Sequence, residues 1–464
     1  MASEGEAPAG EGRRNRRTGR CLGCAGIAVV AIAVAVGGAA WTITRSGRHS
    51  LEAMRAQIRA RGEPLSGAEL NQPPIPDVQN AVVPLRAAAD GLVPDTVAER
   101  FDGMGNDDPA TWPPDTVVAL RRWVGANQQA LALVREAARR PQCRFPVDYT
   151  PGLNTTFPRY REVRDLAPLV RASASVGIAE HRYEAAAADI ATGLALGDCL
   201  DREPTLGGKF VQYAVHAIAL EPARALLREP GVPAEALKMQ RRALDRAAQT
   251  GGLGRALVGE RAIALTGFEM VYGQSPGASG VSPGATPQAR GHYLWFLAEP
   301  DEAYYLEHIA QAIKLADQPH YLVAPKLKRW GERAESDERR FPPKVLGSIM
   351  LPLFGQAAWA QARVLARLQT ARVATAVRLQ YLRAGKLPQK LEGLVPSELA
   401  AVPVDPFSGQ PLRCRIEADG RSFRVYSVGE NMKDDGGVER PRKGQGGAAP
   451  QGGPDDIVVV GVMR

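Results

Sequence analysis

The residues best suited to chemistry stand near the end of the chain, in VYSVGENMKDDGG and, after a sixteen-residue insert, in PDDIVVV. Four aspartates lie in these two segments, Asp434, Asp435, Asp455 and Asp456, and each segment adjoins a short β-rich run. Ca²⁺ takes about six to eight oxygen ligands and is commonly held on glycine-containing loops. Two interpretations follow: loops that hold one cation together, or turns whose carboxylates are simply solvated.

The pattern around the aspartates predicts the elements that hold them. LRCRIEA, SFRVYSV and DIVVVGV are short β-like runs separated by glycine and aspartate turns. A long helical pattern precedes them, from about 345 to 384. If SFRVYSV and DIVVVGV form neighbouring strands, the end of one and the start of the other lie at the same edge. We therefore predict that residues 345–464 pack as one long helix against a small antiparallel sheet.

This C-terminal segment resembles the type IV pilin and type II secretion pseudopilin family. In that family a helix passes a proline, continues through an alanine–tyrosine stretch and turns at a glycine before another proline. Pro352, Ala376, Tyr381, Gly385 and Pro388 stand at those places. The run VPVDPFSGQPLRCR is similar to the family's β-entry, a P-x-D-P run followed by a glycine turn. The resemblance covers about a quarter of the chain.

SVGENMKDDGG and PDDI resemble the calcium-loop end of the major pseudopilin. The resemblance implies calcium as a cofactor and the following metal-ligating candidates: the Val428 carbonyl, Asn431, one of Asp455 or Asp456, and Asp434 and Asp435 in support. Asn431 stands where the family usually has aspartate. The family's peptidase-processed signal is missing, because ESDERRFPPK precedes only about ten apolar residues, too few to span a bilayer. The resemblance thus implies a pilin-type head on a tethered helical domain, and not a processed, polymerising pilin.

The N-terminus predicts the tether. Residues 21–43 contain no charge over 23 positions, enough for a helix that spans the hydrocarbon core. Five arginines in 13–20 place residues 1–20 in the cytoplasm by the positive-inside rule. A cleaved signal peptide is the alternative, since VGGAAW offers small residues to a peptidase. The net charge of +8 invites a nucleic-acid partner, but the one dense basic run has this membrane explanation, so we expect no nucleic acid.

The middle of the chain, 45–340, predicts an exported helical domain. Apolar residues recur at helical spacing, as at Val163, Leu166 and Val170, and the segment 182–200 is rich in alanine. Pro168 predicts a kink or a helix start within the first of these stretches. Residues 272–291 hold five glycines and three prolines, which indicates a flexible loop. Successive helices of this length are typical of a bundle or of helical hairpins.

No catalytic or cofactor-binding residue emerges from the middle of the chain. GQSPG and GVSPG match GxSxG, but both lie in the glycine- and proline-rich loop, without the strand and helix that a nucleophile elbow needs. The six histidines show no metal-ligand spacing. Cys143, Cys199 and Cys414 remain outside the apolar segment; a Cys143–Cys199 disulfide and buried free thiols are both compatible with this pattern.

These observations predict a mainly α protein: a cytoplasmic basic tail (1–20), a transmembrane helix (21–43), an exported helical domain (45–340) and a small α+β pilin-like domain (345–464). We expect it in the inner (cytoplasmic) membrane, with the bulk of the chain on the periplasmic side. The expected role is structural or interactive, with other envelope or secretion-system proteins as partners. The alternative is an exported enzyme with a site among the middle helices.

Overall fold

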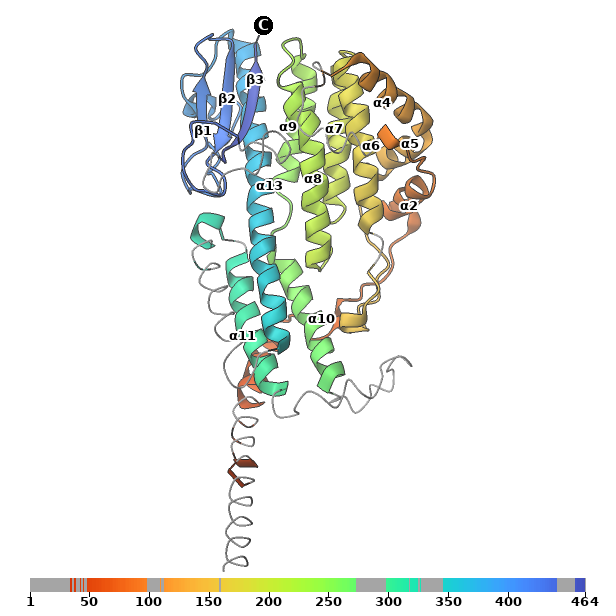
Figure 1. The fold of residues 1–464 in the computed structure, drawn as a ribbon, viewed down its shortest axis with the longest axis vertical. Helices are drawn as coiled ribbons and strands as arrows, with labels where there is room; N and C mark the ends of the chain where they lie inside the picture. Colours follow the sequence, from red (N-terminus) through yellow and green to blue (C-terminus); the bar gives the residue numbers. More distant parts are fainter. Residues whose placement is uncertain are drawn as a thin grey trace, which may run out of the picture.

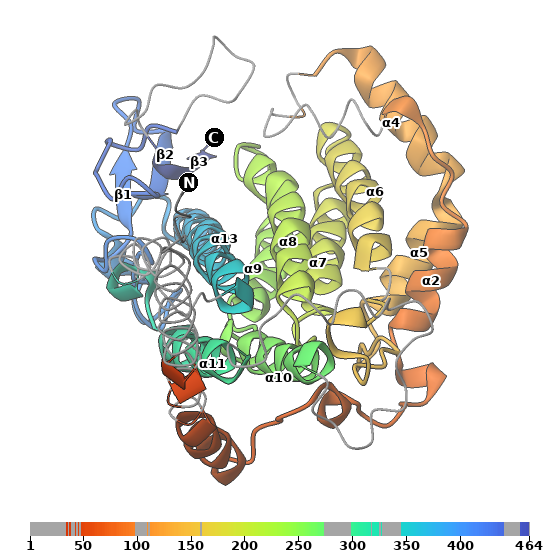
Figure 2. The same cartoon turned by 60° about the horizontal axis from the view of Figure 1, so that its bottom comes forward.

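The computed structural model describes residues 48–97, 112–157, 160–272, 298–316, 318–323, 345–439 and 455–463, with a few isolated positions besides. This part is mainly helical and carries one three-stranded antiparallel sheet, as predicted (Figures 1 and 2). The helices are α2 (Val82–Asp90), α4 (Pro114–Ala126), α5 (Gln128–Ala137), α6 (Tyr160–Ala179), α7 (Tyr183–Asp198), α8 (Leu206–Leu226), α9 (Ala234–Ala247), α10 (Gly254–Tyr272), α11 (Ala298–Ala316) and α13 (Val345–Ala384). The strands are β1 (Arg413–Ile416), β2 (Ser422–Ser427) and β3 (Ile457–Val462), and the short 3₁₀ turns are η1 (Gly67–Leu70), η2 (Asp77–Gln79), η4 (Gly152–Asn154) and η7 (Leu391–Leu394).

Helices α6 to α9 form the centre of the bundle (Figure 1). The apolar face predicted for α6 is confirmed, since Val163, Leu166 and Val170 are all buried. Pro168 lies inside α6, which begins at Tyr160, so the helix does not start at the proline. Its neighbours α2, α4 and α5 cover the outer side of α6, and the side chains between them form a second apolar cluster.

The 40-residue helix α13 runs along most of the molecule, a length of about 60 Å (Figure 1). Near its start, Phe354 and Ala357 pack with α10 and α11. Further along, Val373 and Ala374 belong to the core that also contains α7, α8, α9 and the sheet. The single helix α13 therefore packs against both the bundle and the C-terminal sheet.

Gly385 ends α13. Its φ of 68° lies in the left-handed region that favours glycine, and its N–H donates to the Tyr381 carbonyl at 2.8 Å. The sheet follows in the order β1-β2-β3, with Cys414 opposite Val425 and Val425 opposite Val459. Phe423, Val425 and Val459 are buried in the core that contains α13. The predicted packing of one long helix against a small antiparallel sheet is thus confirmed.

The segment that precedes the bundle is helical over residues 48–60 and is held by charge pairs. Arg48 pairs with Glu299 at 2.8 Å, and Arg55 pairs with Glu302 at 2.5 Å. Arg55 also pairs with Glu269 of α10 at 3.3 Å, so these contacts fix the segment on α10 and α11, as the apolar contacts of Leu51 and Ile58 do.

Among the residues that the structure describes, no helix combines the length and the apolar character that crossing a bilayer requires. The predicted anchor at 21–43 lies outside the described residues except at isolated positions, and so do residues 1–20 and residues 273–291 of the predicted loop.

Candidate functional site

The two aspartate-containing loops meet at one edge of the sheet. Because β2 and β3 are antiparallel and Ser427 stands opposite Ile457, the end of β2 and the start of β3 lie side by side. Gly429 has a φ of 65°, and a side chain there would run into the Asp455 carbonyl. Glycine is therefore required where the loop 428–438 passes the segment 455–456.

A buried carboxylate fixes the start of this loop. Asp405 is 1% exposed and lies in the turn that precedes β1. It accepts hydrogen bonds from the Ser427 hydroxyl at 2.7 Å and from the Val428 N–H at 3.0 Å, besides the Phe407 N–H at 2.9 Å. Asp405 belongs to the sequence segment that resembles the pilin β-entry, and its role here is to lock the end of β2.

Three predicted ligands come together across the two loops. Asp435 Oδ2 accepts from the Asn431 amide at 2.8 Å and from the Asp455 N–H at 2.9 Å. In return, Asp455 Oδ2 accepts from the Glu430 N–H at 3.0 Å. Each loop thus uses a carboxylate to bind the backbone of the other, as charge-assisted hydrogen bonds do at helix and loop ends.

Asp456 lies behind this pair and is buried at 3% exposure. Its Oδ2 accepts from the N–H groups of Gly437 at 2.7 Å and Val438 at 3.3 Å, and Oδ1 accepts from Asp435 N–H at 3.4 Å. Burial raises the pKa of Asp456, while these N–H groups lower it. Asp456 therefore fixes the backbone of residues 435–438 from the buried side of the loop.

The remaining candidates are placed differently. Asp434 turns to Arg413 on β1, with Nε 3.1 Å from Oδ2, and accepts from Gly436 N–H at 3.0 Å. Val428, whose carbonyl is the predicted ligand, precedes Gly429, and its N–H donates to Asp405 Oδ2 at 3.0 Å. Within the described ranges, no three histidine, cysteine or acidic side chains form a group placed to hold a metal ion. In this arrangement, hydrogen bonds between the facing segments hold the two loops together.

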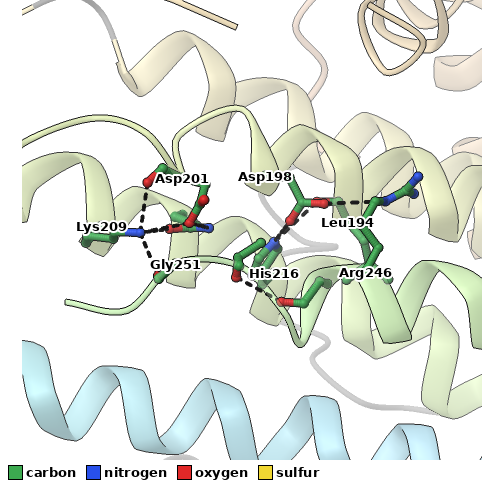
Figure 3. A network of polar contacts seen from close by, with 10 residues as sticks. Leu194, Asp198, Asp201, Lys209, His216, Arg246 and Gly251 are labelled. Carbon is green, nitrogen blue, oxygen red and sulfur yellow. Dashed lines mark hydrogen bonds and ion pairs between the residues drawn. The ribbon is translucent and has the colours of Figure 1, made fainter. Parts of the chain in front are cut away.

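The middle helices hold a buried polar network that sequence analysis missed (Figure 3). Lys209 on α8 is fully buried, and its Nζ donates to Asp201 Oδ1, to the Gly251 carbonyl and to Gln212 Oε1, each at 3.0 Å, and to the Asp201 carbonyl at 3.1 Å. These bonds tie the turn after α7 and the turn after α9 to the first turns of α8. A lysine within a helical pattern normally indicates an exposed position, so the burial of Lys209 was not predicted from the sequence.

A histidine–aspartate pair lies about two helical turns further along α8 (Figure 3). His216 Nε2 is 2.9 Å from Asp198 Oδ1 and 3.2 Å from the Leu194 carbonyl. Both neighbours are acceptors, so Nε2 carries the proton. A side chain at Gly197 would collide with the His216 ring. The glycine makes room for the imidazole, and this close fit suits a packed interior.

A third buried group surrounds Glu203. Its Oε2 accepts from the hydroxyls of Tyr149, at 3.1 Å, and Tyr160. Burial raises the pKa of Glu203, and the two tyrosine hydroxyls oppose that shift. Groups with perturbed pKa values are candidates for acid–base catalysis, but structural networks perturb them as well. Here each oxygen or nitrogen named has a protein partner, so the arrangement favours a structural role.

Comparison with known proteins finds no match for this chain among protein-family models, curated proteins or solved structures.

Proposed function

We propose that this chain is a single-pass protein of the cytoplasmic membrane, with a helical bundle and a pilin-like head on the exported side, and that its role is structural or interactive. The apolar run at 21–43 and its arginine flank support the membrane placement. Other envelope or secretion-system proteins are the partners that the pilin resemblance implies.

The observation that carries the scaffold role is the junction between bundle and head. Arg378 on α13 is 1% exposed and donates to the carbonyls of Leu227 at 2.9 Å, Glu229 at 3.1 Å and Val462. The Val462 N–H also donates to the Leu227 carbonyl at 3.1 Å. One guanidinium thereby ties two chain segments, residues 227–229 and the end of β3, to α13, which suits a protein that keeps its head in a constant position relative to the bundle.

Calcium at the sheet edge is a second part of the proposal. The carboxylates of Asp435 and Asp455 belong to facing loops, and a cation there would reduce the repulsion between like charges. Bound to the folded state alone, it would stabilise the protein by mass action.

The membrane claim is tested by extraction of the full chain from a bacterial host. We expect it to stay with the membrane after an alkaline wash, and a variant without residues 21–43 to appear in the soluble fraction. Recovery of a soluble mature protein that begins near residue 41 would contradict the anchor and favour a cleaved signal peptide.

The competing function is an exported enzyme with Glu203 as an acid–base group, because burial raises its pKa. The two functions differ in how stability responds to substitution. Active-site groups are commonly held at a cost in stability, so their removal stabilises a protein, whereas removal of a structural group destabilises it.

A further inference from the structure

Two cysteines of the bundle share one apolar cluster. Cys199 follows α7 as its C-cap residue, and Cys143 lies in the segment between α5 and η4. Cys199 is 8% exposed and is part of the cluster formed with α2, α4, α5 and α6, and Cys143 packs against the same cluster. Residues that are 56 positions apart in sequence thus meet in the core of the folded chain.

The backbone on both sides of Cys143 is held in place by Asn80. The Asn80 amide donates to the Arg144 carbonyl at 2.9 Å, and Asn80 Oδ1 accepts from the Arg144 N–H at 3.0 Å. The Ala81 N–H donates to the Gln142 carbonyl at 2.8 Å. These contacts fix the backbone on both sides of Cys143, whose side chain packs against the cluster that contains Cys199.

Both thiols pack in this cluster, and the nearness of Cys199 raises the pKa of Cys143. Sulfurs in such contact reach the roughly 2.05 Å of a disulfide by side-chain rotation and a small shift, provided that the Cα atoms are close enough. Cys414 offers a contrast: it stands in β1, on a different element, and burial raises its pKa to about 12. The three cysteines that the structure describes are free thiols.

We propose that Cys143 and Cys199 are a disulfide-forming pair that is oxidised by thiol–disulfide exchange with a disulfide oxidant. The Cys143 thiolate attacks one sulfur of the oxidant and expels the first thiolate. The Cys199 thiolate then attacks the Cys143 sulfur and expels the second. One S–S bond is broken and one is formed, two electrons pass to the oxidant, and the two thiol protons end on the released thiols.

The bond would close a loop that contains α6 and α7 and would fasten the segment after α5 to the end of α7. Contact with Cys199 and burial raise the pKa of Cys143, so little thiolate exists in the folded protein. Exchange is therefore fastest while the chain folds and slow afterwards. This inference goes beyond the scaffold role and concerns the purified chain, so it stands or fails apart from the membrane topology.

The test uses the full chain in detergent, unfolded with reductant and refolded in about equal millimolar oxidised and reduced glutathione. Free thiols are blocked with N-ethylmaleimide after denaturation, and the digest is analysed by mass spectrometry. We expect a linked Cys143–Cys199 peptide about 2 Da lighter than its two reduced halves, and Cys414 labelled in the same sample. The oxidised protein should melt on the order of 5 °C higher than the reduced one.

A variant in which Cys21, Cys24 and Cys414 are replaced by serine retains only the proposed pair and should give the same linked peptide. Cys143→Ser should leave Cys199 labelled. Recovery of both thiols as maleimide adducts, or only as mixed disulfides with glutathione, would overturn the proposal. Because Cys414 serves as an internal control in the wild-type chain, the experiment remains decisive even if the triple variant does not fold.

Discussion

Replacing Lys209 by methionine removes a buried ammonium group and keeps most of the apolar volume of the side chain. In the folded protein that ammonium donates to the Asp201 carboxylate, to Gln212 and to the carbonyls of Asp201 and Gly251. Methionine can donate to none of them. The Asp201 carboxylate and two carbonyls therefore lose a cationic donor in a place where water has little access.

The size of the effect follows from burial. Removing one partner of a buried ion pair costs about 3 to 5 kcal/mol. The Asp201 side chain is 23% exposed, so water restores part of its solvation. We therefore expect Lys209→Met to lower the free energy of unfolding by about 3 kcal/mol. A domain has only about 5 to 15 kcal/mol of stability, so the change is large.

The assay is denaturant unfolding of the full chain in detergent, followed by the helical circular dichroism signal. Lys238→Met is the matched control, because Lys238 pairs with Glu235 at 2.7 Å on the surface, and both side chains are largely exposed. Exposed pairs contribute little, so this variant should unfold like the wild type. If Lys209→Met is as stable as the control, the structural assignment of the network is refuted. A rise in stability would instead point to an active site among these helices.

Three further outcomes are expected. Burial lowers the pKa of His320 to about 4, so the free energy of unfolding that the neutral imidazole contributes is present above about pH 6.5 and is lost as the pH falls toward 4. His320→Phe should remove about 2 to 3 kcal/mol of this pH dependence. Equal pH profiles of the two proteins in denaturant titrations would contradict this. Gly197→Ala should lower the melting temperature, because the new methyl group meets the His216 ring. Gly355→Ala, where a methyl group would meet nothing within 4 Å, should raise it. The reverse order would contradict the packing of Gly197 against His216. Asn431→Asp should lower the melting temperature in chelator, and millimolar calcium should raise the melting temperature of this variant by more than that of the wild type. If calcium changes the melting temperature of neither protein, the result favours hydrogen-bonded loops without a metal.

The secondary structure could be predicted from sequence where local patterns decide it. The helical pattern from about 345 to 384 and the three β-like runs appear as α13, β1, β2 and β3, because periodicity and turn residues are local signals. The meeting of the two aspartate loops was also predictable, since it requires only that β2 and β3 be neighbours.

The contacts between distant residues could not be predicted in this way. Lys209 binds Gly251, and Arg378 binds Leu227, across separations that no local pattern records. For the same reason, the spacing of the acidic residues did not predict that Asp456 would accept hydrogen bonds from backbone N–H groups. Carboxylates in a loop suit a cation and an N–H equally well, and only the folded chain decides between them.

The membrane orientation of the full chain is the most direct test of the account. A reporter that is active only outside the cytoplasm, fused after residue 464, should be active, and the same reporter at the N-terminus should be inactive. Replacing the five arginines of residues 13–20 by serine should weaken this bias, because they set the orientation. An inactive reporter after residue 464, in a chain that is intact and membrane-bound, would contradict the exported bundle and head.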